Sequence, residues 1–170
     1  MAAGSTYTPI ATTTLGSAAA SITLSSIPST YTDLVLVLNG SLTTSGSSVW
    51  VRFNGDTATN YSSTILYGTG TAAGSTRETS VSNGCVFAGY QQGMSTSQST
   101  AIMHIQNYAN TTTYKTTLAR YSDASQEAET AVGLWRKTPE AINSLTAVVV
   151  FGSRVFSIGT TLTLYGIAAA

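Results

Sequence analysis

The stretch at residues 48–56 reads SVWVRFNGD, and it contains the two signals that decide the fold. Valine and phenylalanine alternate with Trp50 and Arg52, which is typical of a β-strand because successive side chains of a strand point to opposite faces. Asn54 and Gly55 follow at once, and both residue types tolerate the positive φ of a tight turn. An alternating strand closed by a tight turn predicts an antiparallel β protein.

The same combination of a short strand and turn residues recurs along the chain in both directions. Further strand-like runs occupy residues 7–15, 19–27, 34–38, 61–67, 100–106, 114–121, 129–135, 144–151 and 160–167. About ten strands with almost no helix predict an all-β antiparallel β-sandwich, and we expect a jelly roll. Residues 68–99 are rich in Gly, Ser, Thr and Gln, so we expect them to form a long surface excursion with a short helix or hairpin near residues 81–89.

The composition fits one domain of this kind. The chain has 170 residues, of which 42% are hydrophobic, and this is enough for one core. Only 8% of the residues are charged, and Ser and Thr supply the missing polarity. We assign residues 16–170 to a single sandwich domain. Residues 1–15 are Thr-rich, and they form either the edge strand of this domain or an extended arm that pairs with a neighbour.

The charge pattern excludes several classes of partner. Seven basic and seven acidic residues give a net charge of zero. Only Arg136 and Lys137 are adjacent cations, whereas nucleic-acid binding needs clustered ones. No apolar run is long enough to span a bilayer, and the first residues do not resemble a secretory signal. We therefore expect no nucleic-acid or membrane partner, and synthesis in a cytoplasm.

The residues that usually carry catalysis are sparse. Cys85 and His104 are the only cysteine and histidine, so neither a disulfide within the chain nor a zinc site with Cys–His spacing can form. We expect His104 to lie on a strand face or at an interface. Glu127 and Glu129 fall on the same side of a predicted strand, where a surface pair is the usual meaning. We predict no enzymatic activity and no cofactor.

Two other acidic residues follow or precede predicted strands. Asp33 precedes the apolar run at residues 34–38, and Asp56 follows the Asn54-Gly55 turn. Both carboxylates are expected to accept backbone N–H groups and so stabilise turns. The alternative for the second is a calcium site with Asn54, Asp56 and Asn60 as oxygen ligands.

Aromatic residues supply the candidates for an interface. The chain has nine Tyr, four Phe and two Trp, and tyrosine is favoured where one end of the ring stays in contact with water. Trp50 and Trp135 are each predicted to lie either in the core or at an interface, and Arg136 follows the second of them. The remaining interface candidates, in the Thr-rich start of the chain, are Tyr7, Pro9 and Ile10.

Several segments resemble a family of small proteins and domains of tailed-bacteriophage virions. They are YTPIATTTL at 7–15, IPSTYTDLVL at 27–36, RFNGDT at 52–57 with NYS at 60–62, NYANTT at 107–112, KT at 115–116, WR at 135–136 with AINSL at 141–145, and LYGI at 164–167. The segments follow one another in order through nearly the whole chain and omit mainly residues 68–99.

The resemblance implies a jelly-roll protein of the virion and carries over no active residues. Members of the family are similar to capsid decoration (cement) proteins and to modules of tail fibres. Since the chain has no long repetitive shaft, we expect a decoration protein that binds the major capsid protein and its own copies, with a trimer as the guess by analogy. The alternative is a tail-fibre or receptor-binding module that contacts host glycan.

Overall fold

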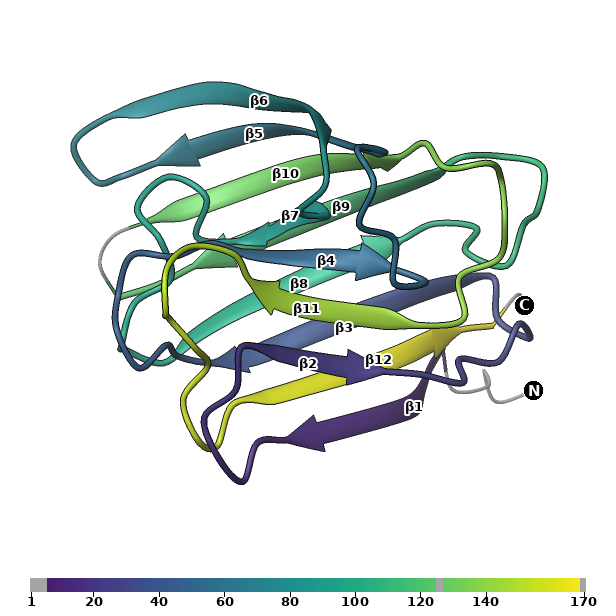
Figure 1. Ribbon diagram of the computed structural model, residues 1–170, viewed down its shortest axis with the longest axis horizontal. Coiled ribbons are helices and arrows are strands. Elements are labelled where there is room, and N and C mark those ends of the chain that lie inside the picture. Colours follow the sequence, from purple (N-terminus) through teal and green to yellow (C-terminus); the bar gives the residue numbers. More distant parts are fainter. Residues whose placement is uncertain (1–5, 125–126, 169–170) are drawn as a thin grey trace.

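The computed structural model describes residues 6–124 and 127–168, which form twelve strands in two antiparallel sheets (Figure 1). The strands are β1 (Tyr7–Thr14), β2 (Ser21–Leu24), β3 (Asp33–Gly40), β4 (Val49–Phe53), β5 (Tyr61–Gly68), β6 (Ala73–Val81), β7 (Cys85–Ala88), β8 (Ser99–Ile105), β9 (Lys115–Ser122), β10 (Ala128–Trp135), β11 (Leu145–Val149) and β12 (Thr161–Ile167). In this part of the chain, no helix is long and apolar enough to cross a membrane.

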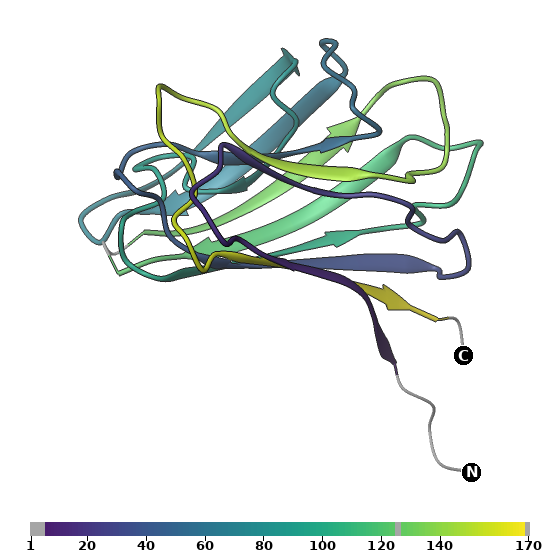
Figure 2. The ribbon, with the colours of Figure 1, turned by 60° about the horizontal axis from the view of Figure 1, so that its bottom comes forward.

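The two sheets face each other as the layers of a sandwich. The larger sheet has the order β1-β12-β3-β8-β9-β10-β5-β6, and the smaller has the order β2-β11-β4-β7. Figure 1 shows the smaller sheet in front of the larger one, with β5 and β6 extending beyond it, and Figure 2 shows the two layers from another side. The predicted all-β sandwich is confirmed, and the jelly-roll arrangement stays a prediction.

The core lies between the sheets and follows from strand alternation. In β3, Leu34, Leu36 and Leu38 are fully buried between the sheets, while Val35 and Val37 point the other way. The aromatic centre of the core is made by Phe53, Tyr61 and Trp135, whose rings lie 5.4–6.4 Å apart. Such buried aromatic groups contribute large areas to the hydrophobic stabilisation of the fold.

Residues 68–99 do not form the surface excursion expected from the sequence. They contribute two strands, of which β6 is an exposed edge strand and β7 is fully buried. The small residues around β7 allow it to pack against β9 and β10 in the core. Cys85 lies in this buried strand as a free thiol, and burial raises its pKa to about 12. The polar composition of the segment belongs to β6 and the loops, which the smaller sheet does not cover.

The start of the chain is an edge strand of its own sheet. β1 pairs with β12 from Tyr7 opposite Ile167 to Thr14 opposite Thr161, with a register shift between Pro9 and Ala11. A proline suits this position because an edge strand leaves half of its N–H groups unpaired. For residues 7–14 the structure therefore has the edge strand and not the arm, and residues 1–5 of the expected arm lie outside the described residues.

Candidate functional site: the outer face of the larger sheet

Within residues 6–124 and 127–168, no further layer covers the face of the eight-stranded sheet that points away from the smaller sheet, and we call it the outer face. Strand register aligns its side chains in rows that cross the sheet from β1 to β6. The first row consists of Pro9, Tyr165, Val35, His104, Leu118, Val132, Thr64 and Arg77. The second row consists of Thr12, Thr163, Val37, Ile102, Arg120, Thr130, Leu66 and Ser75.

Three large apolar side chains of this face are exposed to solvent. Leu66, Leu118 and Val132 are 54%, 48% and 55% exposed, and they lie on the adjacent strands β5, β9 and β10. Scattered apolar residues are ordinary on a protein surface, whereas a contiguous apolar patch marks an interaction site. The outer face is therefore the candidate functional site.

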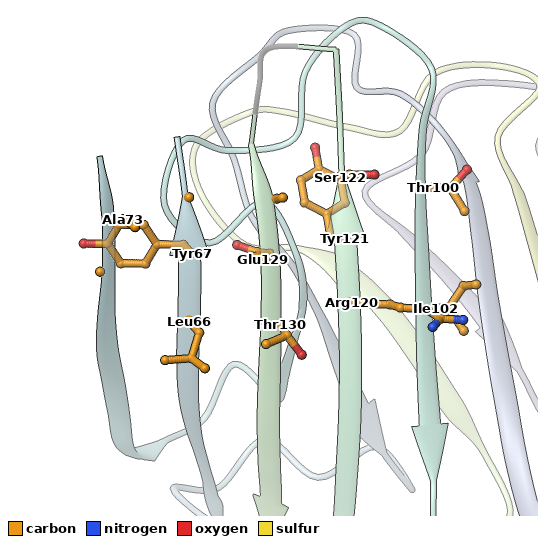
Figure 3. Close-up of a pocket in the computed structure, with 13 residues that line it drawn as sticks. Leu66, Tyr67, Ala73, Thr100, Ile102, Arg120, Tyr121, Ser122, Glu129 and Thr130 are labelled. Carbon is orange, nitrogen blue, oxygen red and sulfur yellow. The ribbon is translucent and has the colours of Figure 1, made fainter. Parts of the chain in front are cut away.

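Two hollows lie side by side on the outer face. The larger has a volume of about 700 Å³, and its lining is mainly apolar. Leu66, Ile102 and Thr130 are among the residues that line it (Figure 3). The smaller, of about 340 Å³, is lined by Tyr7, Val35, Val37, Ile102, His104, Arg120 and Tyr165. Both volumes are large enough for side chains of a partner to enter.

Arg120 lines both hollows, and Figure 3 shows it reaching toward Ile102 on the neighbouring strand. Its side chain is exposed, and on the two rows the other basic side chains are Arg77, at the edge strand β6, and His104. His104 is half-buried on this face, which confirms its predicted place on a strand face. The centre of the outer face thus offers one guanidinium within apolar surroundings.

The predicted interface residues of β1 lie beside this face. Tyr7 is 49% exposed and contacts Tyr165 edge-on, with the ring centroids 6.3 Å apart. Pro9 is exposed at the end of the first row, and Ile10 is half-buried and packs against the core. Tyr7 and Pro9 are therefore available to a partner, whereas Ile10 anchors the edge strand.

Trp50 and Trp135 lie in the core, so the interface alternative for these two residues is wrong. They are 1% and 2% exposed, and each indole N–H has a partner inside the molecule. Trp50 Nε1 donates to Ser48 Oγ at 2.7 Å, and the ring lies 6.1 Å from that of Tyr90. The loop that carries Tyr90 covers the side of β4 on which Trp50 lies. Alternation alone predicts the side of the strand but not what covers it.

Arg136 directly follows β10 and is hydrogen-bonded within its own chain. It is half-buried, its backbone N–H donates to the Asn60 carbonyl at 2.8 Å, and its Nη2 donates to Ser80 Oγ at 3.0 Å. Arg136 Nε is buried and has no hydrogen-bond partner among the described residues. The structure does not bring Arg136 together with Tyr7 and Pro9.

Asp56 organises the loop between β4 and β5, as the sequence predicts. Its carboxylate accepts from Ala58 N at 2.9 Å, Asn60 Nδ2 at 2.9 Å and Trp135 Nε1 at 2.7 Å. Burial alone would raise the pKa of Asp56, but these hydrogen bonds hold it below its ordinary value. Asn54 points elsewhere, since its Nδ2 donates to Glu140 and to the Ala141 carbonyl. The three oxygens proposed for calcium therefore do not converge.

Asp33 also has its predicted role. Its Oδ1 accepts the backbone N–H of Asn107 at 2.7 Å and joins the start of β3 to the loop after β8. In the described part of the chain, no group of three or more His, Cys, Asp or Glu residues is arranged to hold a metal ion.

Glu127 and Glu129 were expected at the surface, and this expectation is wrong. They are 1% and 7% exposed. Glu127 Oε1 accepts from the backbone N–H groups of Gln91 and Gln92 at 3.1 and 3.0 Å, and Glu129 Oε2 accepts from that of Tyr90 at 2.9 Å. The pair therefore fixes the loop after β7 to the start of β10.

Burial raises the pKa of Glu127, and burial together with the charge of Glu127 raises the pKa of Glu129 to about 8. Glu127 Oε2 and Glu129 Oε1 are buried and have no hydrogen-bond partner among the described residues. A proton on Glu129 lessens the cost of burying two like charges together. Two glutamates two residues apart are conspicuous in a chain with so few charged residues, and this spacing identified the pair. The spacing does not show whether the pair is buried or exposed.

Neither a scan against protein-family models nor a search of curated proteins found a match to this chain.

Proposed function

We propose that the protein is a structural component of a tailed-phage virion, a capsid decoration protein that binds the major capsid protein and other copies of itself. The observation that carries the proposal is the apolar, nearly uncharged outer face of the larger sheet. Covering Leu66, Leu118 and Val132 would remove apolar area from water, which is the main favourable term in stable protein association. The resemblance of the segments quoted above supplies the virion context.

The surface chemistry of the chain is compatible with a dense array. Seven basic and seven acidic residues cancel, so neighbouring copies on a shell repel one another weakly. The outer face offers few ion pairs to a partner, so recognition there depends on shape and on apolar area. A decoration protein needs both properties, because it must lie close to its copies and grip a folded shell.

The test is reconstitution onto particles from a phage that carries a deletion of the gene. Purified protein is mixed with these particles, and sedimentation followed by quantitative gels gives the copy number bound. We expect hundreds of copies per particle and greater resistance of the particles to heat. Absence of binding, or a few copies that cryo-microscopy places on the tail, would contradict decoration of the capsid.

The same assay assigns the binding surface. Leu118→Asp places a charge on the outer face, and Ile158→Asp places one on a loop before β12 where the side chain is 67% exposed. We expect the first variant to lose binding and the second to keep it. Both residues are exposed in the isolated chain, so both variants should fold.

The second candidate is a tail-fibre or receptor-binding module that contacts host glycan. The larger hollow favours it, because a guanidinium and the hydroxyls of Thr100, Thr130 and Ser122 line it together with Tyr67. Binding of purified protein to host polysaccharide, lost on Arg120→Ala, would favour this candidate. Equal binding by both proteins would exclude this hollow as the glycan site.

A further inference from the structure

We propose that the outer face packs against the same face of a second copy, about a two-fold axis that follows the first row. This inference rests on the proposed function and assigns the outer face to the contact between copies. The capsid protein would then bind the dimer through another surface, and Leu118→Asp would abolish particle binding by separating the copies. The two larger sheets would form the middle layers of a four-layer dimer. Their faces would lie about 10 Å apart, as in other packed sheets.

The area of the outer face is sufficient for a stable dimer. Eight strands spaced about 4.8 Å apart, each presenting about seven residues at about 3.4 Å per residue, cover roughly 900 Å². A stable protein interface buries about 800 Å² on each partner. The outer face is therefore large enough to hold two copies together without help from other surfaces.

The centre of the row on the axis is mostly apolar. Its central members are Val35, His104, Leu118 and Val132, and none of them carries a fixed charge. In a two-fold arrangement about this row, each strand lies over the same strand of the second copy. Leu118 and Val132 would then meet their own counterparts, and each would lose the water that now covers about half of its surface.

The arginines of the outer face lie off the axis or at the rim of the dimer. Arg120 lies in the second row, two residues along β9 from Leu118, so in the dimer it faces Thr116 of the second copy and not the other Arg120. The two arginines are separated by four residues along the strand direction, about 14 Å. Arg77 stands at the β6 end of the row on the axis and would face its own counterpart there, at the rim of the dimer, where water remains in contact with both guanidinium groups. No charge is buried against a like charge.

Sedimentation equilibrium of the purified chain tests the inference. We expect wild type at about 100 µM to have twice the chain mass of 17.6 kDa. Val132→Asp, which puts two carboxylates on the axis, should raise the dissociation constant by at least about 100-fold. Ile158→Asp is the matched control, because Ile158 is also an exposed β-branched residue but lies off the outer face; it should leave the dimer intact. Circular dichroism checks that each variant is folded.

A cysteine at the axis tests the arrangement itself. Val132→Cys should be joined to its own counterpart by a short bis-maleimide, whereas Ile158→Cys should not, and the native Cys85 is buried and does not compete. A monomeric wild type, a trimer, or a dimer that Val132→Asp leaves unchanged would overturn the inference. If the wild type is a monomer that binds gene-deleted particles, and Leu118→Asp abolishes this binding, the inferred dimer is wrong while the proposed binding to the capsid stands. A dimer that does not bind particles would support the inference and contradict the proposed function.

Discussion

At the scale of single residues, the raised pKa of Glu129 links the stability of the fold to pH. The pKa of Glu129 in the folded chain is about 8, above its ordinary value near 4.5. Between these values the folded chain holds a proton that the unfolded chain releases, so stability is greatest below about pH 4.5 for this group and declines as the pH rises to about 8. Over this whole range the loss should be about 5 kcal/mol.

Glu129→Gln should remove this dependence, because an amide does not titrate and places no second charge beside Glu127. Thermal unfolding between about pH 5 and about pH 8.5 checks it: the wild-type midpoint should fall and that of the variant should change much less. Glu140→Gln is the control, since hydrogen bonds from Asn54 and Lys137 hold the pKa of Glu140 below its usual value and this group stays ionised throughout. Parallel curves for wild type and Glu129→Gln would show that the pKa of Glu129 is not raised.

Gly133 in β10 is the second residue whose environment makes a sharp prediction. A Cβ at this position would lie 2.4 Å from Thr117 Oγ1 and 2.8 Å from Cys85 Sγ, which belong to the strands packed against it. We expect Gly133→Ala to cost about 1–3 kcal/mol through overpacking. Gly68→Ala, with no atom within 4 Å of the new methyl group, should cost far less. Urea unfolding measures both, and equal midpoints would show that the core yields to the methyl group.

At the scale of elements, the loop between β4 and β5 joins the two sheets, and Asp56 fixes it. Asp56→Ala would leave the buried Trp135 indole N–H without its acceptor and release Asn60 and Ala58, so we expect a loss of about 2–3 kcal/mol. Asp56→Asn retains an oxygen acceptor and should lose less. Chemical denaturation monitored by tryptophan fluorescence gives both values. A stability order in which Asn is worse than Ala would contradict this account.

Element prediction from the sequence succeeded where one face of a strand is polar or where turn residues follow. All ten expected strands are present, since runs such as β9 alternate buried and exposed residues along their whole length. β7 lies where a short helix or hairpin was expected, and the sequence could not decide between them because its four residues are all buried and show no alternation. The polar β6 was missed because it is an edge strand with little of its surface covered. Short buried strands and edge strands lack the pattern on which such predictions depend.

The candidate site was less predictable than the strands. Leu118 and Val132 occupy the exposed positions of their strands, and only the full pairing of eight strands brings them together in one row. The interface candidates Tyr7 and Pro9 were chosen by residue type and lie on the edge strand beside these residues, with Pro9 at the end of the first row; their role at an interface stays a prediction. The sequence could not show whether Trp50 is buried or exposed, because this depends on a loop that covers one face of the strand. Such coverage comes from contacts between residues far apart in the sequence.

At the scale of the whole molecule, the low charge content predicts a stability that is nearly independent of salt. The chain has seven basic and seven acidic residues, and the surface ion pair of Lys137 with Glu140 at 2.9 Å is of the kind that contributes little. Raising NaCl from about 20 mM to about 500 mM at constant pH should change the melting temperature by less than about 2 °C. A larger change in either direction would reveal an electrostatic contribution that the folded chain does not display.

The position of Cys85 makes the molecule a reporter of its own opening. The thiol is the only one in the chain and lies between the sheets, where neither a dye nor the thiolate form is accessible. A fluorescent maleimide added to the native protein can react only when β7 leaves its place, so the labelling rate measures how often the sandwich opens. If the protein stabilises a particle for long periods, that rate should be very slow, and assembly should slow it further by holding the larger sheet in place.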